Sequence, residues 1–189
     1  MAKLGILQQS DFNKLMVNFL LTEPFFASIM RLIRKRRTTD GSIPTAGVCV
    51  ENGGFTMYWN PEFIAKLSKE QFFGLLKHEC YHLIFKHVTL RKQDPHLMWN
   101  IATDLAINSH LQHLPEGGLI PGEGKFEGLP KGESAEWYLA NMPDFEEEDQ
   151  GQKGDGADQE GEGGQGGEQG NNSGNGDGMP DSLDDHSGW

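Results

Sequence analysis

One stretch constrains this chain more than any other, a run of helical periodicity from Ser68 to about Arg91. Ser68-Lys69-Glu70-Gln71 matches a capping box, in which the serine caps the helix and the glutamine reaches back to it. The apolar cover comes from Phe72, Phe73, Leu76, Cys80, Leu83, Ile84 and Val88. The sequence therefore predicts one long, largely buried helix around which the rest of a domain packs.

The middle of this helix reads His78-Glu79-Cys80-Tyr81-His82, an H-E-x-x-H pattern. Residues four apart share one helix face, so the rings of His78 and His82 project together and supply two corners of a tetrahedral zinc site. Glu79 lies about 100° further round the helix, where its carboxylate reaches metal-activated water without binding the metal. This is the general-base position of a zinc peptidase. The pattern fixes only three residues, so an ordinary amphipathic helix with two histidines can match it by chance.

A catalytic zinc usually takes three protein ligands and one water, so a third ligand is needed. The segment Trp99–Asn108 predicts a further helix, on which Asn100, Asp104 and Asn108 form a polar stripe. Asp104 follows His82 by 22 residues, which leaves room for a turn and an antiparallel return. We favour Asp104 as the third ligand, with Asn100 and Asn108 as candidates for holding the ligands by hydrogen bonds.

Four histidines are the other candidates for the third ligand: His87, His96, His110 and His113. His87 is nine residues past His78, which on an unbroken helix is about 180° away. It reaches the site only if the helix breaks between Leu83 and Lys86, where there is no glycine or proline. We interpret His87 as a structural histidine bonded to a neighbouring carbonyl.

The flanking segments predict an α+β domain that is mostly helical. The expected helices begin at Asp11, with Ser10 as cap, and at Pro24, the latter ending in the basic run 34–37 with its cations near the helix C-terminus. Short helices are expected at 61–67 and 134–139. Segments 43–50 and 55–59 flank Asn52-Gly53-Gly54 and predict a β-hairpin. The strand 55–59 is a candidate edge for an extended peptide.

The charge of the chain is concentrated in its last quarter. The net charge is −12, but residues 144–189 hold 14 acidic residues and one lysine, so residues 1–143 are nearly neutral. We predict a folded domain over 1–143, a disordered acidic, glycine-rich linker over 144–178, and a short terminal segment, 179–189, with renewed apolar character. This segment is a candidate for docking on the domain, or for presenting His186 or an aspartate to the zinc as an inhibitory plug. A partner protein could bind through the acidic tail or through this segment.

Composition also bears on where such a chain works. No apolar run suits a signal peptide or approaches the ~20 residues of a membrane span. Cys49 and Cys80 are too few for a disulfide framework and suit a reducing compartment. We expect a soluble, cytoplasmic protein without membrane contact. The basic run 31–37 alone does not make nucleic acid an expected partner.

Beyond the five-residue motif, the chain resembles the metallopeptidase-type domain of bacterial and phage proteins, often found upstream of a von Willebrand factor A-like domain. The matching parts are Pro44-Thr45-Ala46-Gly47, Asn60-Pro61-Glu62-Phe63, His78-Glu79-x-x-His82 with His87 and Arg91, and Trp99-Asn100-Ile101-Ala102-x-Asp104-x-x-Ile107-Asn108. They cover about residues 10 to 140. The resemblance implies a zincin-like fold around the H-E-x-x-H helix, a Zn²⁺ cofactor, and a family position for Asp104. No von Willebrand-like segment follows in this sequence.

The resulting hypothesis is a zinc-dependent peptidase that acts on a peptide or protein, with Glu79 as general base. The alternative is an inactive or structural-metal module that serves as an adaptor or in assembly. The oxyanion partner stays open among Tyr58, His110, His113 and Tyr138.

Overall fold

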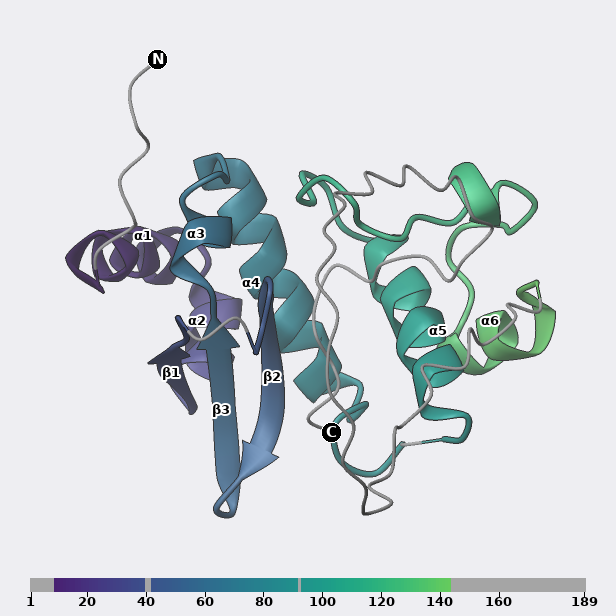
Figure 1. Cartoon of the computed structure of the whole chain (residues 1–189), viewed down its shortest axis with the longest axis horizontal. Coiled ribbons are helices and arrows are strands. Elements are labelled where there is room, and N and C mark those ends of the chain that lie inside the picture. The colour runs from purple at the N-terminus through teal and green to yellow at the C-terminus, as the bar shows by residue number, and fades with distance from the viewer. Residues whose placement is uncertain (1–8, 40–41, 92, 144–189) are drawn as a thin grey trace, which may run out of the picture. The chain divides into compact units, whose positions relative to one another are not determined.

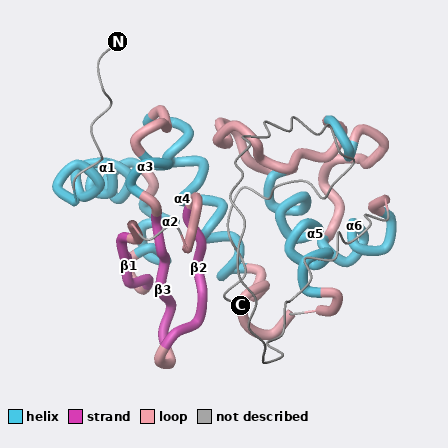
Figure 2. The backbone as a smooth tube through the Cα atoms, viewed as in Figure 1, coloured by secondary structure: helices cyan, strands magenta, loops and turns pink. Residues whose placement is uncertain are grey.

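The computed structural model describes residues 9–39, 42–91 and 93–143 of the 189-residue chain. Within these ranges six α-helices and one short 3₁₀ helix accompany a three-stranded sheet (Figures 1 and 2). The predicted α+β class is therefore confirmed. The predicted linker 144–178 and terminal segment 179–189 lie outside the described residues. None of the described helices is both long and apolar enough to cross a membrane.

The first helix, α1 (Gln9–Thr22), begins two residues before the predicted start at Asp11. Its Phe12 ring stacks on Trp59 at 4.0 Å between centroids, and meets Phe72 edge-on at 5.7 Å. All three rings are fully buried, and burying a ring of this size contributes about 2–3 kcal/mol each. This cluster joins α1 to the sheet and to the helix that carries the histidine motif.

The basic run after α2 (Pro24–Met30) is a strand, so its expected place at a helix C-terminus is wrong. The strand, β1 (Ile33–Arg37), pairs in parallel with β3, and this long-range pairing outweighs the local helical pattern. Ile33 is buried, and the Lys35 side chain turns back to donate to the Ile33 carbonyl at 2.7 Å. Burial lowers the pKa of Lys35.

The predicted hairpin is confirmed as β2 (Ala46–Glu51) and β3 (Gly54–Trp59), which pair antiparallel. Asn52 and Gly53 both have positive φ, at 50° and 72°, as a two-residue hairpin turn with right-handed strand twist requires. The strand order is β1-β3-β2, so β3 has a neighbour on both sides. The expectation that 55–59 pairs with an extended peptide is therefore wrong, because its backbone groups already serve β1 and β2.

Two helices follow the sheet, α3 (Pro61–Ile64) and α4 (Lys69–Ile84). The capping box at the start of α4 is confirmed: Ser68 Oγ accepts from the Gln71 N–H at 3.1 Å, and Gln71 Oε1 accepts from the Ser68 N–H at 2.9 Å. The predicted extension to about Arg91 is wrong, because α4 ends at Ile84. Lys86 then takes a left-handed conformation, with φ 62°.

The second half of the described chain holds α5 (His96–Asn108), the 3₁₀ helix η1 (Gly124–Phe126) and α6 (Ala135–Asn141). The prediction of a helix over 99–108 is confirmed, and the helix starts three residues earlier. The α4 helix contacts the sheet through β2 and also contacts α5, which in turn packs against α6. It thereby presents one side to the sheet and another to α5 (Figure 1).

Gly74 allows the chain that leaves α5 to lie directly against α4. A Cβ at this position would lie 2.6 Å from the carbonyl oxygen of His113 and 3.1 Å from that of Gln112. Glycine has a poor helix propensity, but at this position it lets the backbone of Gln112 and His113 lie against α4, one turn before His78.

Candidate metal centre

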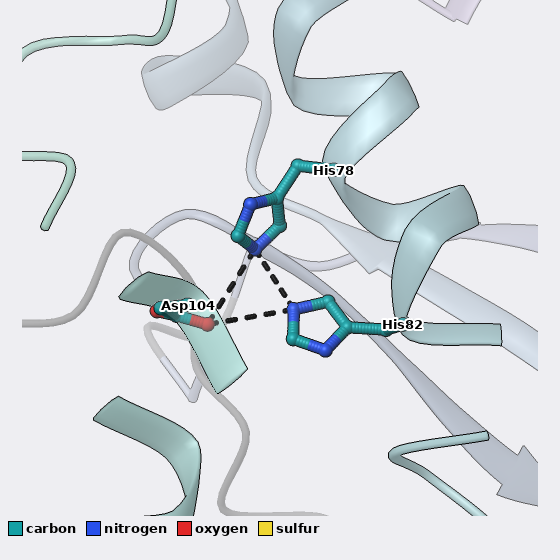
Figure 3. Close-up of side chains that lie close together, drawn as sticks. All are labelled: His78, His82 and Asp104. Carbon is teal, nitrogen blue, oxygen red and sulfur yellow. Dashed lines mark hydrogen bonds and ion pairs between the residues drawn. The ribbon is translucent and has the colours of Figure 1, made fainter. Parts of the chain in front are cut away.

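The side chains of His78, His82 and Asp104 converge on one point between α4 and α5 (Figure 3). Each offers one donor atom, and these atoms lie within 4.8 Å of one another. His78 Nε2 and His82 Nε2 are 2.8 Å apart, and Asp104 Oδ1 lies 3.6 Å from the first and 3.4 Å from the second. All three side chains are fully buried. Of the candidates for a third partner, the structure thus brings Asp104 to the two motif histidines.

Two imidazoles and a carboxylate are the donor set that zinc takes in many protein sites. Tetrahedral zinc with ligands at about 2.0–2.2 Å holds its donor atoms about 3.3–3.6 Å apart. The two separations that involve Asp104 lie in that range. The separation between the two Nε2 atoms is shorter by about 0.5 Å, a difference that small rotations of the rings can supply. The chemistry of the donors and their spacing therefore fit a metal ion.

The other ring nitrogen of His78 is held by Asn108. His78 Nδ1 lies 2.7 Å from Asn108 Oδ1, and Asn108 Nδ2 donates to the Leu119 carbonyl at 2.9 Å. The second bond assigns the amide: its nitrogen faces Leu119 and its oxygen accepts from the His78 Nδ1–H. His78 consequently turns the lone pair of Nε2 toward His82 and Asp104. Asn108 is thus brought to a motif histidine, as its place on the polar stripe suggested.

The other ring nitrogen of His82 faces His87. The two Nδ1 atoms lie 3.3 Å apart, and His87 is 1% exposed. The sequence interpretation of His87 is therefore wrong in two respects: the helix does break between Leu83 and Lys86, and the partner is an imidazole rather than a carbonyl. Burial, reinforced by the nearby Arg91 charge, lowers the pKa of His87 to about 3, so the ring is neutral near pH 7.

Glu79 follows His78 on α4 and its side chain is fully buried. Its carboxylate is not part of the group of converging donor atoms found among the described residues. Asn100, one turn before Asp104, is 5% exposed, and among the described residues no hydrogen bond reaches its Oδ1. A buried amide oxygen without a donor is costly and marks a position that suits a further polar group.

The thiols stand apart from the group of donor atoms. Cys49 is half-buried and Cys80 is buried, and both are free. Burial and the neighbouring Glu79 charge raise the pKa of Cys80 to about 12. At neutral pH this thiol is protonated, and only a thiolate binds metal well.

A known protein family matches almost the whole chain. Residues 8–188 match the model of a family described as "Putative metallopeptidase domain". The chain belongs to this family. It is also 23% identical over 116 residues to an "Uncharacterized protein" of Thermotoga maritima; the match covers 59% of this chain and 28% of that protein. The chain thus spans well under half the length of this relative. No solved structure matches this chain.

In this family member two pockets flank the α4–α5 pair, and both include His110. One, of about 380 Å³, is lined among others by Lys77, Tyr81 and His113, and the other, of about 240 Å³, reaches His87 and Arg91.

Two of the sequence candidates for the oxyanion partner are already engaged. The Tyr58 hydroxyl donates to Glu51 Oε2 at 3.3 Å, and the Tyr138 hydroxyl donates to the Pro130 carbonyl at 2.7 Å. His110 and His113 line the larger pocket and are the two that stay open.

Proposed function

We propose that this chain is a zinc-dependent peptidase whose zinc is held by His78, His82 and Asp104. The observation that carries the proposal is the convergence of two imidazole nitrogens and a carboxylate oxygen within 4.8 Å, all from fully buried side chains. Membership of a metallopeptidase family supports the same chemistry. The substrate class that follows is a peptide or protein.

The bound zinc would supply a Lewis acid that polarises the scissile carbonyl and acidifies water. The chain's own residues then handle the proton. Glu79 accepts it from the attacking water and returns it to the leaving amine, because its carboxylate is the one motif donor outside the ligand group. Asn108 fixes the His78 ring by accepting from Nδ1–H, so that Nε2 stays available. Burial of the group strengthens each of these electrostatic interactions.

The alternative is a structural metal in an inactive adaptor or assembly module. One observation favours it: the donor side chains are 0% exposed, and structural zinc sites are closed. The count of donors favours a catalytic site, because the group found among the described residues has three members, which leaves a position for water. A peptidase needs Glu79 for hydrolysis, whereas an inactive module hydrolyses no peptide with or without Glu79.

The test compares wild type with Glu79→Gln for zinc content and for hydrolysis of a mixture of unstructured peptides. The variant keeps the shape of the side chain and removes the base. The proposal predicts one zinc per chain in both proteins and a loss of about 10²–10⁴-fold in hydrolysis in the variant. Glu62→Gln, at an exposed glutamate of α3, is the matched control and retains full activity. Full hydrolysis by Glu79→Gln, or wild type that binds zinc and hydrolyses no peptide, would contradict the proposal.

A further inference from the structure

Both histidines of the motif have their second ring nitrogen against a buried side chain. His78 Nδ1 meets Asn108 Oδ1 at 2.7 Å, and His82 Nδ1 meets His87 Nδ1 at 3.3 Å. An imidazole that binds metal through Nε2 carries its proton on Nδ1 and is oriented by whatever accepts that proton. For His78 the acceptor is an amide oxygen. For His82, a ring nitrogen of another histidine lies within reach.

The end of α4 is what brings His87 back to His82. The His87 N–H donates to the His82 carbonyl at 2.9 Å, and the Lys86 N–H donates to the Leu83 carbonyl at 3.1 Å. With Lys86 in the left-handed conformation, this is a Schellman motif. In such a motif the side chains at the positions of His82 and His87 usually make an apolar contact. Here the same geometry brings together two imidazoles, with ring centroids 5.4 Å apart.

His87 is itself held on several sides. Its ring meets Trp99 of α5 at 5.8 Å in a T-shaped arrangement and Phe85 at 5.6 Å. Arg91 secures the segment that carries it, donating to the Phe85 carbonyl at 3.4 Å and to Glu136 Oε1 of α6 at 3.1 Å. The ring is therefore fixed by aromatic packing, and its backbone segment is fixed by the hydrogen bonds of Arg91. A group that orients a neighbouring side chain must be held in this way.

We propose that His87 is a positioning residue that accepts the Nδ1 proton of His82, so that His82 presents its Nε2 lone pair to the metal. The inference rests on the proposed function, because it assigns to His82 the role of a zinc ligand. In this arrangement the proton of His87 is on Nε2 and its Nδ1 is unprotonated. His87 and Asn108 then play matching roles behind the two ligating rings.

The first test is zinc affinity, measured by competition with a chromophoric chelator for wild type, His87→Leu and His87→Gln. Loss of the acceptor in His87→Leu weakens zinc binding by about 10–100-fold. His87→Gln, whose amide oxygen can accept, recovers a large part of the loss, which a purely packing role would not produce. His96→Leu, at the first residue of α5, is the control and binds as wild type does. Equal affinity of wild type and His87→Leu would overturn the inference.

The second test needs no variant. In zinc-loaded wild type with ¹⁵N-labelled histidine, long-range ¹H–¹⁵N spectra read the protonation of each ring nitrogen. The expected pattern is a protonated Nδ1 on His82 and an unprotonated Nδ1 on His87. A protonated Nδ1 on His87 would overturn the inference while zinc binding stood. Absence of zinc binding in wild type would instead remove the proposed function and this inference together, so the two failures are distinct.

Discussion

The backbone N–H of His87 donates to the carbonyl of His82, five residues earlier, at 2.9 Å, and α4 ends between them at Ile84. The residue between them that makes this possible is Lys86, whose φ is 62°. Glycine is the usual residue there, because a Cβ in the left-handed region costs about 1–2 kcal/mol. The chain thus keeps an exposed lysine in a strained conformation one residue before His87.

Replacing Lys86 with glycine should stabilise the domain. Relief of the left-handed strain outweighs the greater entropy of glycine in the unfolded chain, so we expect a gain of about 0.5–1 kcal/mol in the free energy of unfolding. Urea denaturation of wild type, Lys86→Gly and Lys86→Ala measures it. The alanine variant keeps the Cβ and should gain nothing. A loss of stability in Lys86→Gly would show that the motif is not formed as described.

Replacing Gly74 with alanine should destabilise the domain although alanine favours helices. The new Cβ would lie 2.6 Å from the His113 carbonyl oxygen, and backbone cannot yield cheaply. We expect a loss of about 1–3 kcal/mol in the free energy of unfolding. Gly128→Ala is the matched control, because no atom lies within 4 Å of a Cβ built there. Equal thermal midpoints for the two variants would refute the close contact between α4 and the segment after α5.

Replacing Asn108 should weaken zinc binding according to what remains to accept from His78. Asn108→Leu removes the acceptor 2.7 Å from Nδ1, and we expect a loss of about 10–100-fold in zinc affinity. Asn108→Asp keeps an acceptor and should bind zinc within about tenfold of wild type. Chelator competition measures both. Wild-type affinity in Asn108→Leu would mean that the ring of His78 needs no support.

The ion pair between Arg91 and Glu136 should contribute to stability in a pH-dependent way. Burial alone would raise the pKa of Glu136, but the hydrogen bond and charge of Arg91, together with hydrogen bonds from the Glu136 backbone and Ser134, outweigh it, and the pKa lies below its ordinary value. A depressed carboxylate pKa gives stability that is present above the unfolded pKa and is lost as pH falls through the folded one. Because the pair is partly exposed, we expect about 0–1 kcal/mol between wild type and Glu136→Gln at pH 7. Unfolding curves from pH 7 to 3 should show that difference shrink as the pH falls; a constant gap would exclude this linkage.

Local signals in the sequence were enough for several elements. The capping box at Ser68, the turn at Asn52-Gly53 and the helix over 99–108 depend on residues close together in the chain, and all three are present. The polar stripe of that helix also pointed to Asp104, since four-residue spacing fixes a helix face. Its meeting with the motif histidines needed only that α4 and α5 pack together.

The missed features depend on interactions that are distant in sequence or on an unusual residue. The strand β1 forms because β3 pairs with it. Four consecutive basic residues give no local signal for that pairing. The end of α4 was missed because a lysine occupies the left-handed position where glycine would have marked the stop. One signal was available: His82 and His87 are spaced as the two side chains that meet in a Schellman motif.

A zinc-edge anomalous difference map from crystals of the zinc-loaded chain tests the central claim most directly. The account predicts one strong peak about 2.0–2.2 Å from Nε2 of His78, Nε2 of His82 and a carboxylate oxygen of Asp104. It also predicts that Asp104→Ala lowers the height of that peak. A peak held by other residues, or Asp104 turned away from the two rings with no donor in its place, would contradict it.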